Sequence, residues 1–279
     1  MKIYVLLVTI IIVFVIILVL LGLIYKFIFN INRMEKNKES ITKDGKSFLS
    51  NIMIINIYDN IEFDPKFKTG LGFACVVKLK NNTILFDTGG DSETLLTNLE
   101  LAEIKPKEIG IVVLSHIHGD HTGGLLGFLR RNSNVKVYIL KSFPSSFKEK
   151  IKATGAEVVE VSNLIRIIEG IYSTGELGIW IKEQSLVINS DKGLIIITGC
   201  AHPGIVNIVK RVKALFNKDI YLVMGGFHHP PIEVVREFKE LGVKKVAPSH
   251  CTGDEAIKAF EREYQDCLLY TSDAADEGL

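Results

Sequence analysis

The chain of 279 residues has little of several features that usually reveal a protein's class. Its four cysteines show no disulfide-like spacing, which favours a reducing compartment. Its 33 basic and 32 acidic residues leave a net charge of +1, so the basic excess typical of nucleic-acid binding is missing and no nucleic-acid partner is expected. The sequence contains no G-x-S-x-G nucleophile elbow and no G-x-x-x-x-G-K-[ST] phosphate loop, which argues against serine hydrolases and P-loop enzymes.

What the chain does contain is four potential metal ligands within six residues, in the sequence His116-Ile117-His118-Gly119-Asp120-His121. This cluster follows the apolar run 111–114, which is typical of a buried strand, so a rigid sheet would position it. Imidazole nitrogens and carboxylate oxygens suit zinc, iron or manganese, and such a loop can serve two neighbouring ions. A polar loop that merely happens to be rich in histidine is the alternative, and it leaves the strand context unexplained.

Three further polar side chains come directly after strand-like apolar runs. His202 follows the run 194–197, and His250 follows a short run that ends at Ala247. Asp87 follows 84–86 and begins an Asp-Thr-Gly-Gly turn. Since two ions need more ligands than one loop supplies, His202 and His250 are the candidates for the remaining positions.

These elements, taken in order, resemble the motifs of the metallo-beta-lactamase superfamily over roughly residues 52–264. The resemblance implies a four-layer αβ/βα sandwich with the metal ions held by loops between the inner sheets. It also implies that Asp87 orients a metal ligand. The ligands that it implies are His116, His118 and His202 for the first ion, and Asp120, His121 and His250 for the second.

One departure from the family pattern lies at Gly199-Cys200. Many hydrolases of the superfamily carry Gly-Asp there, and the aspartate bridges the two ions. Cys200 is a possible ligand, because a thiolate binds zinc or iron; a small buried thiol behind the site is the alternative. The stretches 199–204, 225–228 and 250–253 resemble the dihydropteroate-synthase-like branch of the superfamily, which includes archaeal proteins of methanopterin biosynthesis.

Other polar residues carry less specific expectations. Asp120 is placed to orient a bound water or accept its proton as well as to bind metal. His228 is expected at the mouth of the site, binding substrate or shuttling protons, although its Gly/Pro-rich loop also suits a histidine that only contacts backbone. Glu183 is expected to be an exposed carboxylate at the end of a strand. Cys75, within an apolar run, is expected in the core.

The expected function is that of a metal-dependent hydrolase. Two divalent ions, zinc before iron or manganese, would activate water against an ester, amide or phosphoester bond in a small-molecule substrate. The first alternative is a transferase that joins a dihydropterin to an arylamine-type partner, as the branch resemblance implies. The second alternative is a metal-binding sensor or redox module that has lost hydrolysis along with the bridging aspartate.

The two ends of the chain differ from the central region in composition. Residues 3–25 carry no charge and are long enough to cross a hydrocarbon core of about 30 Å, which predicts a single-pass anchor within 1–29 and a lipid bilayer as partner. Lysines and arginines that follow this segment favour a cytoplasmic catalytic domain. Residues 30–50 read as a polar linker and 51–266 as a catalytic domain that has lost its natural end. Residues 267–279 look like a translated sequencing adapter.

Alternating strand-like and helical patterns between residues 52 and 264 predict an α/β layered fold. Strands are expected at 52–57, 74–79, 83–86, 111–114, 135–140, 158–161, 185–188 and 194–197. Helices are expected at 93–101, 124–131, 205–216, 231–241 and 254–264.

Overall fold

The computed structural model describes residues 14–22, 24–25, 49–62 and 64–268. The chain divides into two compact units, Met1–Lys46 and Ser47–Leu279, and each is described by itself. The predicted linker 30–50, catalytic domain 51–266 and adapter-derived segment 267–279 stay predictions. Of these segments, residues 30–48, 63 and 269–279 lie outside the described residues.

The first unit corrects the prediction of a membrane anchor. Its described residues, 14–22 and 24–25, are helical. Within the described part of the chain, no helix has both the length and the apolar character needed to span a bilayer. The predicted anchor and the membrane localisation are therefore wrong on this finding, whereas the lipid bilayer as a partner stays a prediction. Residues 3–13 and 23 of the predicted segment lie outside the described residues.

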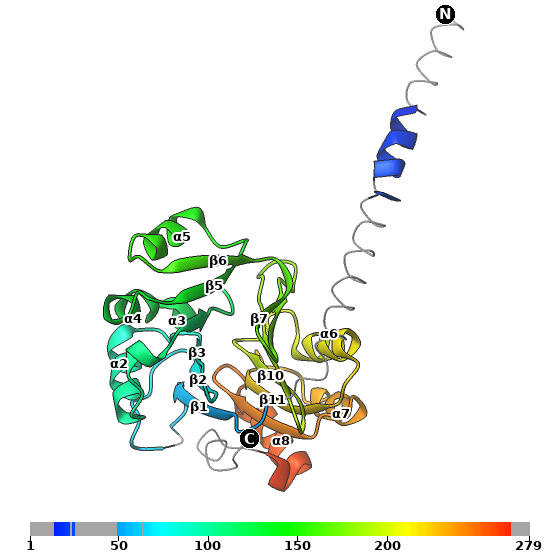
Figure 1. The fold of residues 1–279 in the computed structure, drawn as a ribbon. Coiled ribbons are helices and arrows are strands. Elements are labelled where there is room, and N and C mark those ends of the chain that lie inside the picture. Colours follow the sequence, from blue (N-terminus) through cyan, green and yellow to red (C-terminus); the bar gives the residue numbers. More distant parts are fainter. Residues whose placement is uncertain (1–13, 23, 26–48, 63, 269–279) are drawn as a thin grey trace, which may run out of the picture. The chain divides into compact units, whose positions relative to one another are not determined.

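The second unit contains two six-stranded mixed sheets, one from each half of its sequence (Figure 1). The strands of the first sheet lie in sequence order: β1 (Met53–Tyr58), β2 (Ala74–Lys78), β3 (Thr83–Phe86), β4 (Ile111–Val113), β5 (Lys136–Leu140) and β6 (Glu157–Val161). The pairs β1–β2 and β2–β3 are antiparallel, whereas β3 to β6 run parallel. The carboxyl ends of β3 and β4 therefore meet at one edge of the sheet, where Asp87 and the 116–121 loop begin.

The second sheet has the same strand number and a similar mixture of directions. Its strands are β7 (Asn163–Ile168), β8 (Ile171–Gly175), β9 (Leu186–Ser190), β10 (Gly193–Thr198), β11 (Ile220–Gly226) and β12 (Lys245–Ser249). The strands β7 to β10 are antiparallel, and β10 to β12 run parallel. The loops that follow β10, β11 and β12 carry His202, His228 and His250, so parallel pairing again gathers the candidate residues at one end.

Helices cover the outer faces of both sheets, with α2 and α4 outside the first and α6 and α7 outside the second (Figure 1). The helices are α2 (Ser92–Leu101), α3 (Gly119–Thr122), α4 (Leu125–Arg131), α5 (Ser145–Lys152), α6 (Ile205–Phe216), α7 (Val234–Glu240) and α8 (Asp254–Tyr264). Two short 3₁₀ helices, η1 (Pro106–Glu108) and η2 (Gln265–Cys267), complete the set of described elements.

The apolar core explains why the two sheets pack against each other and helices cover the first sheet's other face. In β4, Ile111 and Val113 lie in the apolar core shared by both sheets, whereas Val112 lies in the core between the first sheet and α2 and α4. Alternate side chains of a strand point to opposite faces, so a strand that is apolar throughout is buried on both faces. The resulting helix–sheet–sheet–helix layers agree with the expected αβ/βα sandwich.

Candidate metal centre

The 116–121 segment leaves β4 and enters the short helix α3, and neighbouring loops hold it by its backbone. The N–H and hydroxyl of Thr88 both donate to the carbonyl of His121, at 2.8 and 2.9 Å. The Phe73 N–H donates to the carbonyl of Asp120 at 3.3 Å. A Cβ atom at Gly72 would lie 2.1 Å from that carbonyl oxygen, so only glycine allows this approach. Backbone hydrogen bonds from two neighbouring loops thus hold the cluster in place.

The structure brings three imidazole nitrogens together as a first donor group, made of His116, His118 and His202. His116 Nε2 lies 3.1 Å from His118 Nδ1 and 3.3 Å from His202 Nε2. Nitrogens bound about 2.0–2.1 Å from one zinc ion at tetrahedral angles would lie about 3.3 Å apart. The spacing of this group thus fits three ligands of one ion.

A second donor group lies beside the first and comprises Asp120, His121, Cys200 and His250. His121 Nε2 lies 3.5 Å from Asp120 Oδ2 and 3.2 Å from Cys200 Sγ. His250 Nε2 lies 3.4 Å from the same Asp120 oxygen. These donor atoms come from loops of both sheets, and their separations again fit the edges of a tetrahedron around one ion.

Asp87 accepts hydrogen bonds that orient two of the histidines. Its carboxylate accepts from the N–H and hydroxyl of Ser115, both at 2.6 Å, and from Nδ1 of His121 at 2.7 Å. The Ser115 oxygen is then free to accept from His116 Nδ1 at 2.9 Å. With the proton on Nδ1 in both rings, Nε2 would present its lone pair to a metal ion at the donor group.

Asn60, which follows β1 of the first sheet, hydrogen-bonds to His250, which follows β12 of the second sheet. Its Oδ1 accepts from His250 Nδ1 at 2.6 Å, and its Nδ2 donates to the His250 carbonyl at 3.2 Å. The neighbouring Asp59 Oδ1 accepts from the His250 N–H at 3.1 Å. Nε2 of His250 is buried and has no hydrogen-bond partner among the described residues. A buried, unpartnered nitrogen costs free energy unless something fills the position, and a metal ion would do so.

Glu183 holds the loop that carries Cys200 and His202. The prediction that it is exposed is wrong, because its side chain is fully buried. Its Oε1 accepts from the Thr198 hydroxyl and from the N–H groups of residues 199, 200 and 201, at 2.9–3.1 Å, and its Oε2 accepts from the His202 N–H at 2.8 Å. The polar loop surrounding this carboxylate therefore explains its burial, which a hydropathy pattern does not reveal.

This geometry agrees with a family comparison of the sequence. The model of the metallo-beta-lactamase superfamily matches residues 68–212, just over half of the chain. The chain belongs to the metallo-beta-lactamase superfamily. Proteins of this superfamily commonly bind divalent metal ions, and both donor groups of this member suit such ions.

Two curated relatives come from the archaeon Methanocaldococcus jannaschii. One is 7,8-dihydropterin-6-methyl-4-(beta-D-ribofuranosyl)-aminobenzene-5'-phosphate synthase, 29% identical over 274 residues, with 78% of this chain and 93% of the relative covered. The other is an uncharacterized protein, 30% identical over 246 residues, with 74% and 92% covered. The similarity to the synthase supports an enzyme acting on a small molecule.

Solved structures show the same fold. Tm1679, described as a metal-dependent hydrolase of the beta-lactamase superfamily, is 27% identical and superposes with a TM-score of 0.66, covering 79% of this chain and 96% of that one. YhfI from Bacillus subtilis has a TM-score of 0.59 at 11% identity, covering 79% and 97%, and supports the fold alone.

Burial and neighbouring charges shift the pKa values of several donor residues. Burial and the neighbouring charge of His121 lower the pKa of His116, and burial lowers that of His202 to about 4. Burial opposes protonation of His121 as well, but the Asp87 carboxylate raises its pKa to about 10. The neighbouring His121 and His250 side chains hold the pKa of Asp120 well below its usual range. Metal binding at the second group must therefore displace a proton from His121.

Two further side chains, Cys251 and His228, lie beside donors of the two groups. Cys200 is 4% exposed, and its sulfur lies 3.4 Å from that of Cys251. The contact with Cys251, together with burial, raises the pKa of the Cys200 thiol. His228 is exposed, and its ring lies 4.4 Å from that of His202, so the structure places it at the edge of the first group. Cys75 is fully buried in the core, as expected.

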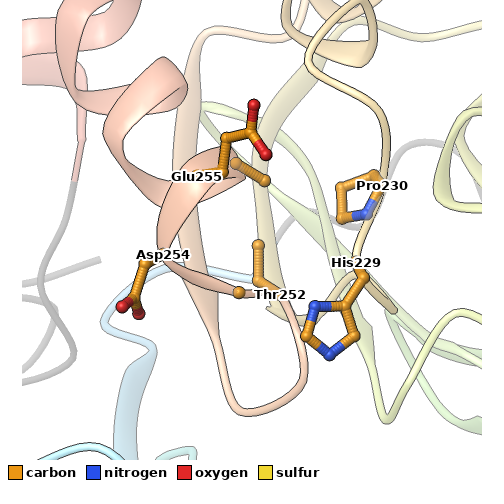
Figure 2. Close-up of a pocket in the computed structure, with 7 residues that line it drawn as sticks. His229, Pro230, Thr252, Asp254 and Glu255 are labelled. Atoms are coloured by element: carbon orange, nitrogen blue, oxygen red, sulfur yellow. The ribbon is translucent and has the colours of Figure 1, made fainter.

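An open pocket of about 420 Å³ lies between the start of α8 and the loop after β11. Figure 2 shows His229 and Pro230 on one side, Thr252 between, and Glu255 on the helix opposite. His229 and Thr252 directly follow His228 and Cys251 in sequence.

Proposed function

We propose that this chain is a dinuclear metal enzyme that joins a dihydropterin to an aminobenzene-type amine. The observation that carries this proposal is similarity to the archaeal synthase across 93% of that relative's length. The two donor groups support the metal dependence. The relative's name describes a dihydropterin linked through its 6-methyl group to a substituted aminobenzene, and the same class of product is proposed here.

The two donor groups are proposed to have different tasks. The first has three protein donors and leaves one tetrahedral position open, as catalytic zinc sites do. The second has four and would be closed around its ion, with Cys200 as a ligand. Imidazole, thiolate and carboxylate in tetrahedral array favour zinc in both positions; iron and manganese are the alternatives. The open position at His116, His118 and His202 is therefore where substrate would bind.

The side chains around that position suit a group transfer. Bound divalent cations would neutralise negative charge that develops on a phosphate or other leaving group. Asp120, whose Oδ2 lies 3.5 Å from His121 and 3.4 Å from His250, would keep its negative charge beside the second ion. His228 is exposed beside His202, where it can accept the proton that an attacking amine must lose.

Hydrolysis is the second candidate function. The open position at the first donor group equally suits a bound water, whose pKa a divalent cation would lower. The similarity to Tm1679, described as a metal-dependent hydrolase and 27% identical, supports this alternative. In that case Asp120 would orient the water or accept its proton.

Paired activity assays on zinc-loaded protein separate the two functions. One supplies a dihydropterin with a leaving group on its 6-methyl carbon and a 4-substituted aniline, and mass spectrometry looks for the new C–N bond. The other supplies ester, amide and phosphodiester substrates and measures hydrolysis. The coupled product supports the synthase; hydrolysis without coupling replaces it by the hydrolase. Metal binding with neither activity contradicts both and leaves a metal-binding sensor or redox module.

A further inference from the structure

Two cysteines that are far apart in sequence meet at the edge of the second donor group. Cys200 follows β10 and Cys251 follows β12, and their sulfur atoms lie 3.4 Å apart. The Cys251 sulfur also lies 3.7 Å from the Cys200 carbonyl. A disulfide needs about 2.05 Å between the sulfurs, so the pair must close by only about 1.4 Å.

The surroundings leave room for this closure. A Cβ at residue 226 would lie 2.7 Å from the Cys251 sulfur, so Gly226 provides the space that this thiol occupies. Cys251 is half-buried, whereas Cys200 is almost fully buried, so a small solute reaches Cys251 first. The other two cysteines differ from this pair: Cys75 is buried in the core and Cys267 is exposed on η2.

We propose that Cys200 and Cys251 form a reversible disulfide when the protein meets a peroxide. The Cys251 sulfur attacks one peroxide oxygen, the O–O bond breaks, and a sulfenic acid and one water form. The Cys200 sulfur then attacks the Cys251 sulfur, so that the S–S bond forms, the S–O bond breaks, and the hydroxide leaves with the thiol proton as a second water. Two thiols are oxidised by two electrons, and one hydrogen peroxide is reduced.

Oxidation would change the metal centre, and this part of the inference rests on the proposed function. Cys200 is the one thiol in the second donor group, and a disulfide sulfur no longer offers a thiolate to a metal ion. The first group contains only histidines and would keep its ion. The second group would then offer three donors in place of four, so the oxidised protein would hold its second ion more weakly than the reduced protein does.

The test begins with metal-free full-length protein carrying Cys267→Ser, which removes the exposed thiol and so prevents disulfides between molecules. Of the four cysteines three remain, and denatured protein should titrate three thiols before hydrogen peroxide and one after it. Peptide mass spectrometry should find residues 200 and 251 in one cross-linked species that dithiothreitol separates. Adding Cys251→Ser should abolish the cross-link, whereas Cys75→Ser should retain it. Peroxide that leaves both thiols free, or oxidises them separately to sulfinic acids, overturns the proposal.

Metal content then separates this inference from the proposed metal centre. In competition with a zinc chelator, reduced protein should keep two ions per chain and peroxide-treated protein one, with the second restored by dithiothreitol and zinc. Loss of zinc should not occur in the Cys251→Ser variant at the peroxide dose that cross-links the parent. A reduced protein without metal refutes the metal centre but not the thiol pair. Cross-linking without zinc loss refutes the link between the pair and the second ion.

Discussion

The two halves of the sandwich supply metal donors in opposite ways. The first sheet places four donors on one hexapeptide after β4, and the local sequence alone brings them together. The second sheet places three donors on two loops, after β10 and β12, that are separated by about fifty residues of sequence. Only parallel pairing of β10, β11 and β12 gathers them.

This difference extends to the groups that support each set of donors. Asp87 and Ser115 support the hexapeptide from within the same sheet. His250 of the second sheet is held by Asn60 of the first, so its orientation depends on how the sheets pack. We infer that the first half would survive local disturbance as a partial metal site, whereas the second half depends on tertiary contacts.

The largest expected effect comes from removing hexapeptide donors. His116→Ala or Asp120→Ala should abolish turnover and remove at least one metal ion, because each deletes a donor that no other described side chain replaces. Metal analysis and the paired activity assays measure both effects. His229→Ala, at an exposed histidine outside both donor groups, is the matched control for metal content. Full metal content and activity in either donor variant would contradict the assignment.

Glu183→Gln should be the next most severe change. The amide nitrogen would face N–H groups that now donate to a carboxylate oxygen, so about 3 kcal/mol of unfolding free energy should be lost. Urea unfolding of metal-free protein measures the loss. Glu169→Gln makes the same chemical change at an exposed position and should be neutral. Equal stability of the two variants would show that the buried carboxylate does not hold the loop.

Changes at Asn60 test the contact between the halves. Asn60→Leu should weaken binding of the second ion roughly 10- to 100-fold, because His250 loses the acceptor that fixes its ring. Asn60→Asp keeps that acceptor and should restore most of the affinity. Competitive zinc titration measures both, and the spectrum of cobalt-substituted protein reports the geometry at the second group. If the Asn60→Leu and Asn60→Asp variants bind the second zinc ion equally well, Asn60 does not orient His250.

The smallest effects concern the pH dependence of stability. In metal-free protein, His202 of the second half and His121 of the first should change the stability with pH in opposite directions. His202 has its pKa lowered to about 4, so its contribution to stability is present above about pH 6.5 and is lost as pH falls toward 4. His121 has its pKa raised to about 10, so its contribution is present below about pH 6.5 and is lost as pH rises through 10. Urea midpoints of His202→Gln and His121→Gln against pH should flatten on the acidic and alkaline sides respectively. A parallel response in both variants would contradict the opposite signs.

Secondary structure was predictable where amphipathic periodicity is strong. The helices expected at 205–216 and 254–264 coincide with α6 and α8. The hairpin of β7 and β8 was missed, because Leu164 to Ile168 is apolar except for Arg166 and shows no clear alternation, and the turn is only Glu169-Gly170. The helix α5 was missed as well, since only Lys148 and Ile151 are buried along its length. Packing against the neighbouring strands decided both.

The sequence by itself determined the chemistry of the centre, because donor types and the spacing of 116–121 are local properties that a strand end preserves. The tertiary structure alone decided how the distant donors are held. Three contacts join residues from different elements. They are the hydrogen bonds of the buried Glu183, the hydrogen bond between Asn60 and His250, and the contact between Cys200 and Cys251. A side chain's burial and hydrogen-bond partners depend on what the rest of the fold packs around it, and no window of neighbouring residues contains that information.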